Sequence, residues 1–161
     1  MAPSFETEIC VTLGKPLEGP DVTPEAARAA IVAVAPGIEL VEKRGDFAGD
    51  LPLTMADNVQ QKFFITGPIT EPLPPGESLS NAEVEVLVNG ETVDSAKGEV
   101  IRGGPEASVA WLANTLHDFG KTLEKGHQIM TGSLTRQHPI AKGDLVEVNF
   151  TPYGSVQAEF E

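Results

Sequence analysis

Apolar and polar side chains alternate along residues 5–13, and this period-two pattern predicts a β-strand. Phe5 and Ile9 fall on one face of the predicted strand, and Glu6 and Glu8 fall on the other face. The two faces therefore differ in chemistry, with one suited to a core and one suited to solvent or to a ligand.

Two segments carry the signals of helices. Thr23 suits the N-cap position and Pro24 the first helical position, so we expect an Ala-rich helix that begins here and runs to about Ala35. A Pro-Gly pair at 36–37 would end it. Apolar side chains three and four positions apart predict a second helix over residues 105–118, with one buried stripe.

Turn residues separate several further short strands. Asn89-Gly90, between two alternating segments, is a strong signal for a tight hairpin. Residues 45–52 are expected to form a loop. The other predicted strands cover residues 38–41, 62–66, 82–88, 91–101, 127–131, 145–150 and 155–160. This pattern predicts an α+β fold, in which mostly antiparallel strands curl into a rolled or barrel-like sheet with two helices.

Composition narrows the class of protein. The chain has 161 residues, which suits a single domain, and its formal net charge is −13. Such an acidic chain is not expected to bind nucleic acid or an anionic membrane surface. Cys10 is the only cysteine, no apolar run is long enough to cross a bilayer, and residues 1–6 do not read as a signal peptide. We therefore expect a cytoplasmic protein.

Glu6 and Glu8 are the first candidates for chemistry. Two residues apart on a strand, their carboxylates point to the same face about 7 Å apart and can converge on a hard cation. The alternative is a solvated strand face. Glu83 and Glu85 have the same spacing in the predicted hairpin and serve as an internal comparison.

Glu39 is the second candidate, because it interrupts an apolar segment at 38–41. A carboxylate among apolar neighbours is costly unless it is paired with a cation or hydrogen-bonded. Arg44 is one possible partner and a metal ion is the other, and the residues alone leave both open.

The remaining polar residues give weaker signals. Hydroxyls around a glycine at the end of a strand can hold a carboxylate, but a plain turn is the alternative. The residues concerned are Thr131, Gly132, Ser133 and Thr135. The three histidines share no spacing typical of metal ligands. Cys10 has no flanking base, so we interpret this cysteine as a small buried side chain.

Several ordered motifs resemble the catalytic domain of the fumarylacetoacetate hydrolase superfamily. Within it they are most similar to the 2-keto-4-pentenoate hydratase and 2-oxohept-3-ene-1,7-dioate hydratase branch. The motifs are the E-x-E strand at 5–9, Leu-Gly-Lys-Pro-Leu at 13–17, the Glu39 segment at 38–44, Ala-Asp-Asn at 56–58, the helix at 108–114, Thr-Gly-Ser-Leu-Thr at 131–135, Lys-Gly-Asp at 142–144 and Gly-Ser-Val at 154–156. They run in register over nearly the whole chain.

The resemblance implies a specific chemistry. Glu6, Glu8 and Glu39 would bind one Mg²⁺ or Mn²⁺, which chelates a small 2-oxo acid and stabilises its enolate. The substrate-binding residues would be Asn58, Thr131, Gly132, Ser133 and Thr135. The resemblance also implies a homodimer or larger oligomer.

The sequence departs from the family's pattern in three places. The family usually carries an N-terminal segment that contributes a lysine and acidic groups, and residues 1–161 are expected to be a single catalytic-type domain without it. The residues at 59–61 and 102–104 also differ from the usual ones. Lys62 is then the remaining candidate for proton transfer, so we expect metal binding to be retained better than turnover.

Three alternatives to the hydratase stay open. A vinylogous 2-oxo-acid decarboxylase would use the same metal and enolate. A carbon–carbon hydrolase is less favoured, because no Glu-His pair to activate water is evident. A truncated, non-catalytic homologue that acts as a binding or scaffold subunit belongs to a different class.

Overall fold

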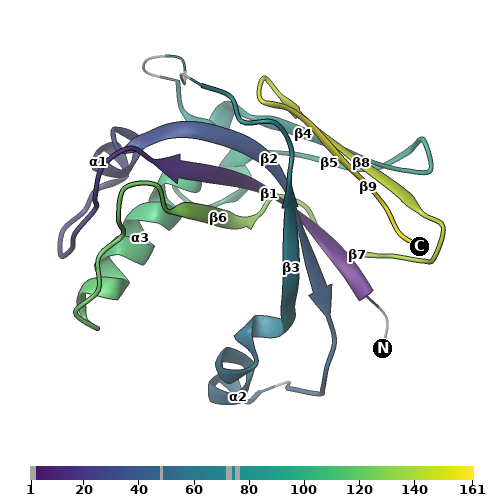
Figure 1. Cartoon of the computed structure of the whole chain (residues 1–161), viewed down its shortest axis with the longest axis horizontal. Helices are drawn as coiled ribbons and strands as arrows, with labels where there is room; N and C mark the ends of the chain where they lie inside the picture. Colours follow the sequence, from purple (N-terminus) through teal and green to yellow (C-terminus); the bar gives the residue numbers. More distant parts are fainter. Residues whose placement is uncertain (1–2, 48, 72–73, 75–76) are drawn as a thin grey trace.

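The computed structural model describes residues 3–47, 49–71, 74 and 77–161, and its strands form two antiparallel sheets. The first sheet has the order β3 (Gln61–Thr66), β2 (Ile31–Glu42), β1 (Pro3–Leu13) and β6 (Gln128–Ser133), with β7 (His138–Pro139) also paired to β1. The second has the order β5 (Glu91–Lys97), β4 (Glu83–Val88), β8 (Leu145–Thr151) and β9 (Gly154–Glu159). Figure 1 shows both sheets. The predicted α+β class is confirmed, and the rolled or barrel-like sheet takes the form of two open sheets.

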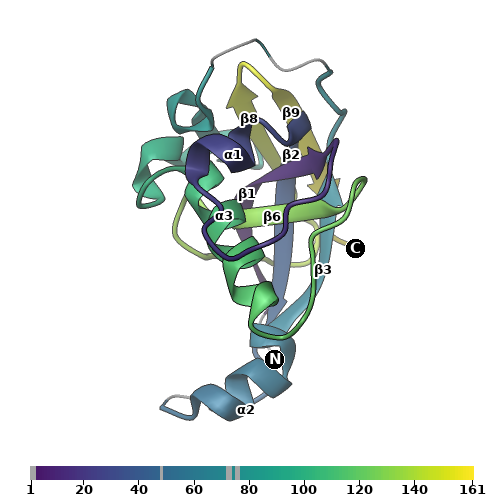
Figure 2. The same cartoon turned by 90° about the vertical axis from the view of Figure 1, so that its left-hand side faces the viewer.

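Three α-helices accompany the sheets: α1 (Pro24–Arg28), α2 (Leu51–Ala56) and α3 (Pro105–His117). Single 3₁₀ turns are η1 (Asn58–Gln60), η2 (Leu79–Asn81) and η3 (Gly98–Val100). The long helix α3 contacts both α1 and β6, whereas α2 lies apart from them, where β2 ends and β3 begins (Figure 2). No helix in the described part of the chain is both long and apolar enough to cross a membrane.

Local sequence signals correctly predict the hairpin and the second helix. Asn89 and Gly90 both adopt positive φ between β4 and β5, which is the geometry of a two-residue hairpin turn. Helix α3 begins at Pro105, as expected, and Gly120 just beyond its end has φ +64°.

The first helix is shorter than predicted. Thr23 caps it through a bond from the Ala26 N–H to its hydroxyl, but α1 ends at Arg28 and β2 begins at Ile31. Residues 31–35 pair with β1, so tertiary contacts override the Ala-rich helical signal. Pro36 is tolerated within β2 because pairing with β3 begins only at the next residue, and no ladder bond is lost there.

The prediction of a loop over residues 45–52 misses the start of α2. Asp50 caps this helix by accepting a hydrogen bond from the Leu53 N–H, and a proline occupies its first turn. Cap and proline were both present in the sequence, but α2 buries none of its residues. A helix without a buried face shows no apolar stripe, which is why periodicity did not indicate it.

The two faces of β1 lie in different surroundings. Phe5, Ile9 and Val11 point into the main core, where they join apolar side chains from β2, the second sheet and α3. Glu6 and Glu8, which alternate with them, lie on the opposite face. The candidate functional residues therefore lie on the face of the first sheet that is turned away from the main core.

Candidate metal centre

Strand pairing brings three carboxylates together. Glu6 lies directly opposite Glu39 in the β1–β2 ladder, and Glu8 lies opposite Gly37, two residues along. One carboxylate oxygen from each of Glu6, Glu8 and Glu39 falls within 4.8 Å of the others. The structure thus assembles the three residues that the sequence singled out as candidate ligands.

Neighbouring groups act on two of the carboxylates. The Gly132 N–H donates to Glu8 Oε2 at 2.7 Å, and the nearby Ser133 side chain acts to lower the pKa of Glu6. Gly132 has φ +107° and lies in an irregular stretch where β6 slips its register against β1. This bulge turns a backbone N–H toward Glu8, which a regular ladder would have used for pairing.

The electrostatics of the cluster favour a cation. The pKa of Glu8 is raised to about 8. Burial is the largest cause, and the hydrogen bond to Glu39 and the charges of the nearby carboxylates act in the same direction, while the bond from the Gly132 N–H lowers the pKa. Burial and then the charge of Glu39 raise the pKa of Glu6. No cationic side chain in the described residues contributes to either shift. Three oxygens that repel one another in a largely buried position fit a hard divalent cation.

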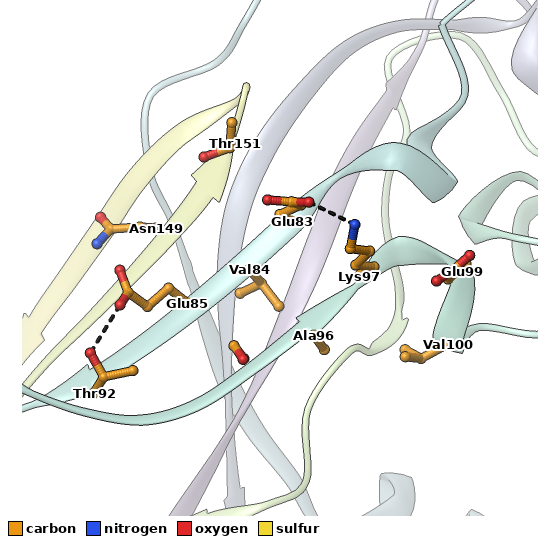
Figure 3. Close-up of a pocket in the computed structure, with 11 residues that line it drawn as sticks. Glu83, Val84, Glu85, Thr92, Ala96, Lys97, Glu99, Val100, Asn149 and Thr151 are labelled. Carbon is orange, nitrogen blue, oxygen red and sulfur yellow. Dashed lines mark hydrogen bonds and ion pairs between the residues drawn. The ribbon is translucent and has the colours of Figure 1, made fainter.

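Glu83 and Glu85 show what the same spacing gives without a third carboxylate. Both side chains lie on an open surface of the second sheet, where Glu83 pairs with Lys97 at 2.8 Å and Glu85 accepts a bond from Thr92 (Figure 3). Both side chains are exposed. Their neighbours already satisfy them, so the comparison pair has no need of a metal.

Arg44 is not the partner of Glu39. Its guanidinium binds the Asp57 carboxylate and the backbone oxygens of Asp57 and Gln61. These bonds connect the end of β2 to the segment that precedes β3. The ion-pair alternative for Glu39 is therefore wrong.

The predicted substrate-binding residues lie in different settings. The Thr131 hydroxyl donates to the Ile9 carbonyl inside the protein, and the Thr135 hydroxyl is bonded to that of Thr7. The Ser133 hydroxyl donates to the Thr135 carbonyl beside the cluster. In the described structure, these hydrogen bonds within the protein hold the 131–135 segment next to the carboxylate cluster.

Asn58 and Lys62 lie farther along the chain, next to β3. The Asn58 amide donates to the Gln61 side chain, and Asn58, Val59 and Gln60 all have positive φ, which is costly for residues other than glycine. Lys62 pairs with Glu42 at 3.1 Å. A proton-transfer role for Lys62 would require this pair to open.

Sequence reasoning missed three residues beside the cluster. Phe64 lies opposite Glu39, while Met130 reaches over Gly37, where a Cβ would come within 2.8 Å of the Met130 methyl carbon. Residues 63–65 form an apolar run, Phe-Phe-Ile, so alternation gave no signal for the face on which Phe64 lies. Its place next to Glu39 depended on the β2–β3 register, which the sequence does not specify.

The fold and the cluster define an α+β domain with a carboxylate centre of the kind that holds a hard divalent cation. The chain belongs to the fumarylacetoacetate hydrolase family: residues 1–161 match the family model described as fumarylacetoacetate (FAA) hydrolase C-terminal. This confirms the family that the motifs suggested.

Relatives with assigned activities cover almost all of this chain. It is 36% identical to a 2-hydroxyhexa-2,4-dienoate hydratase of Comamonas testosteroni over 159 residues, which is 98% of this chain and 60% of the relative. It is 32% identical to a 2-keto-4-pentenoate hydratase of Paraburkholderia xenovorans strain LB400, over 99% of this chain and 59% of the relative.

Solved structures of a 4-oxalocrotonate decarboxylase from Pseudomonas putida G7 superpose with a TM-score of 0.92 at 36% identity. They cover 100% of this chain and 61% of the decarboxylase. One is complexed with calcium and acetate, and the other with magnesium and adipate. The present chain therefore spans about three fifths of the length of these relatives.

Proposed function

We propose that this chain is the metal-binding, enolate-stabilising domain of a lyase of the 2-keto-4-pentenoate hydratase type. The observation that carries the proposal is the cluster of Glu6, Glu8 and Glu39, where carboxylates gather in a buried position with no described cation beside Glu6 or Glu8. The hydratases among the relatives support the substrate class, a small 2-oxo acid or its 2-hydroxy-dienoate form.

The three glutamates would hold Mg²⁺ or Mn²⁺ through oxygen ligands alone, and waters or substrate would complete the coordination. Such a cation supplies the positive charge that stabilises the developing enolate of a 2-oxo acid. Calcium and magnesium in the related decarboxylase support a divalent ion.

The chain's own groups prepare this site. The Gly132 N–H fixes one oxygen of Glu8, so this carboxylate is oriented before a substrate arrives, and the Ser133 side chain lies near Glu6. We propose that the segment that contains Thr131, Gly132, Ser133 and Thr135, together with Asn58, binds the substrate carboxylate. Lys62 is our candidate for proton transfer, after release from Glu42.

A vinylogous 2-oxo-acid decarboxylase is the second candidate. The decarboxylase from Pseudomonas putida G7 is as similar in sequence as the hydratase from Comamonas testosteroni, at 36% identity. Both reactions need the same enolate, so the cluster is compatible with either. A non-catalytic binding or scaffold subunit is the third possibility, and retention of the full carboxylate cluster argues against it.

We further propose a cytoplasmic protein that assembles as a homodimer or larger oligomer. A single cysteine suits a reducing compartment. The open edges of both sheets leave strands that can be covered by a second copy.

The test of the proposed function combines metal binding with turnover. Calorimetry should show one Mg²⁺ or Mn²⁺ per chain, lost in Glu8→Gln and retained in the matched control Glu85→Gln. Ultraviolet absorbance with 2-hydroxy-2,4-dienoates then separates hydration from decarboxylation, the latter assayed with 4-oxalocrotonate. A chain that binds no divalent ion would refute the proposal. A chain that binds metal and oxalate but turns over neither substrate would support the metal- and enolate-binding role and would count against Lys62 as a sufficient proton carrier.

A further inference from the structure

An apolar side chain, Phe64, lies beside the three carboxylates on the same face of the first sheet. Glu6, Glu39 and Phe64 are successive partners across β1, β2 and β3, so their side chains emerge on the same face in one row. Directly opposed residues in such ladders have Cβ atoms about 5 Å apart. The Phe64 ring is therefore the immediate neighbour of the Glu39 carboxylate.

Phe64 is also available for contact. Its side chain is 46% exposed, and it does not belong to the main core or to the partly buried side chains packed against it. The next residue of β3 on the same face, Thr66, is opposite Gly37, which is in turn opposite Glu8. Gly37 has no side chain, which leaves room above it for the thioether of Met130.

Met130 covers Gly37 from the β6 side of the sheet. It pairs with Cys10 on β1, and its thioether extends across to Gly37. A flexible methionine and a phenylalanine thus flank a glycine beside the carboxylates. Thioether and aromatic surfaces attract apolar ligands and conjugated planar ones.

We infer that Phe64 and Met130 bind the hydrocarbon end of the substrate, so that this site selects 2-oxo acids with an apolar tail over those with a second carboxylate. The inference rests on the proposed function, because it takes the 2-oxo end of the ligand to lie at the glutamates. Lys62, two positions from Phe64 on β3, is paired with Glu42 at 3.1 Å, and no cation among the described residues offsets Glu6 or Glu8. A distal carboxylate would therefore have to displace Glu42 or lie beside apolar and negative groups.

The test is a ligand series measured by calorimetry on the full chain at saturating Mg²⁺. We expect 2-oxobutanoate and 2-oxopentanoate to bind successively tighter than pyruvate, by up to about fourfold for each methylene buried. We expect 2-oxoglutarate, which has the length of 2-oxopentanoate but a terminal carboxylate, to bind no better than pyruvate.

Phe64→Ala should abolish the gain with chain length, so that pyruvate, 2-oxobutanoate and 2-oxopentanoate bind this variant with similar affinities. Phe64→Leu keeps an apolar side chain and should retain part of the gain, which guards against a folding defect. Phe63→Ala is the matched control: Phe63 is 47% exposed on the same strand, but it is opposite Leu40 on the other face.

Two failures can be told apart. If pyruvate itself does not bind with Mg²⁺, the proposed function is refuted and the inference falls with it. If pyruvate binds but the longer acids gain nothing, or if 2-oxoglutarate matches 2-oxopentanoate, the inference alone is overturned. Equal losses in Phe63→Ala and Phe64→Ala would also overturn it.

Discussion

Replacing Glu8 by glutamine should stabilise the metal-free protein at neutral pH. The amide oxygen can still accept the Gly132 N–H, and the amide nitrogen can donate to Glu39 where the carboxylic acid proton would lie. Glu8→Gln therefore keeps the bonds of the protonated acid and removes the charge that the cluster repels.

The magnitude follows from the pKa of Glu8, which rises from 4.5 to about 8 on folding. Because the folded protein holds this proton more tightly than the unfolded chain, the stabilisation is fully present below pH 4.5. It is lost progressively as the pH rises toward 8. At about 1.4 kcal/mol per pKa unit, taking up this proton on folding costs the wild type about 3 kcal/mol at pH 7, a cost that glutamine does not have.

Urea unfolding followed by circular dichroism, in EDTA from pH 4.5 to pH 8, measures this effect. The free energy of unfolding of Glu8→Gln should exceed that of the wild type by about 3 kcal/mol at pH 7, and the difference should vanish at the acidic end. Saturating Mg²⁺ should stabilise the wild type and leave Glu8→Gln unchanged.

Glu85→Gln is the control, since Glu85 is exposed and lies in the comparison pair. It should follow the wild type at every pH. If wild type and Glu8→Gln gave parallel curves over the whole range, the argument that repulsion within the cluster destabilises the metal-free fold would be wrong.

Three further predictions concern packing and reactivity. Gly98→Ala should lower the free energy of unfolding by about 1–3 kcal/mol, since its Cβ would clash with the Leu79 carbonyl oxygen, whereas Glu99→Ala should change little in the same urea titration. Arg44→Met should speed amide hydrogen exchange in residues 51–60, because Arg44 ties the Asp57 segment to β2. Cys10 should react with a thiol reagent only after unfolding, since its side chain is 2% exposed and burial raises its pKa to about 11.

Local rules were sufficient where a few adjacent residues determine the geometry. Asn89-Gly90 specifies a tight turn by its own backbone preferences, and Pro105 with the following apolar stripe specifies the start of α3. The segment after Arg28 shows where such rules fail. Its alanines favour a helix in isolation, yet pairing with β1 makes it part of a long strand.

In the candidate site too, local rules placed some residues and failed to place others. The alternation of β1 was enough to place Glu6 and Glu8 on one face. Two partners remained open for Glu39, and only the register of β2 against β1 brought it to Glu6 while Arg44 turned to Asp57. Register is a non-local property, and the apolar run at residues 63–65 does not alternate, so Phe64 escaped notice.

The bond from Gly132 to Glu8 joins residues 124 positions apart in the chain. During synthesis, Glu6, Glu8 and Glu39 emerge from the ribosome long before the strand that orients them. The centre is consequently among the last features that a growing chain can complete, because β6 must dock on β1 first. A cation that binds only the complete centre would stabilise only those chains in which β6 is paired with β1 in the correct register.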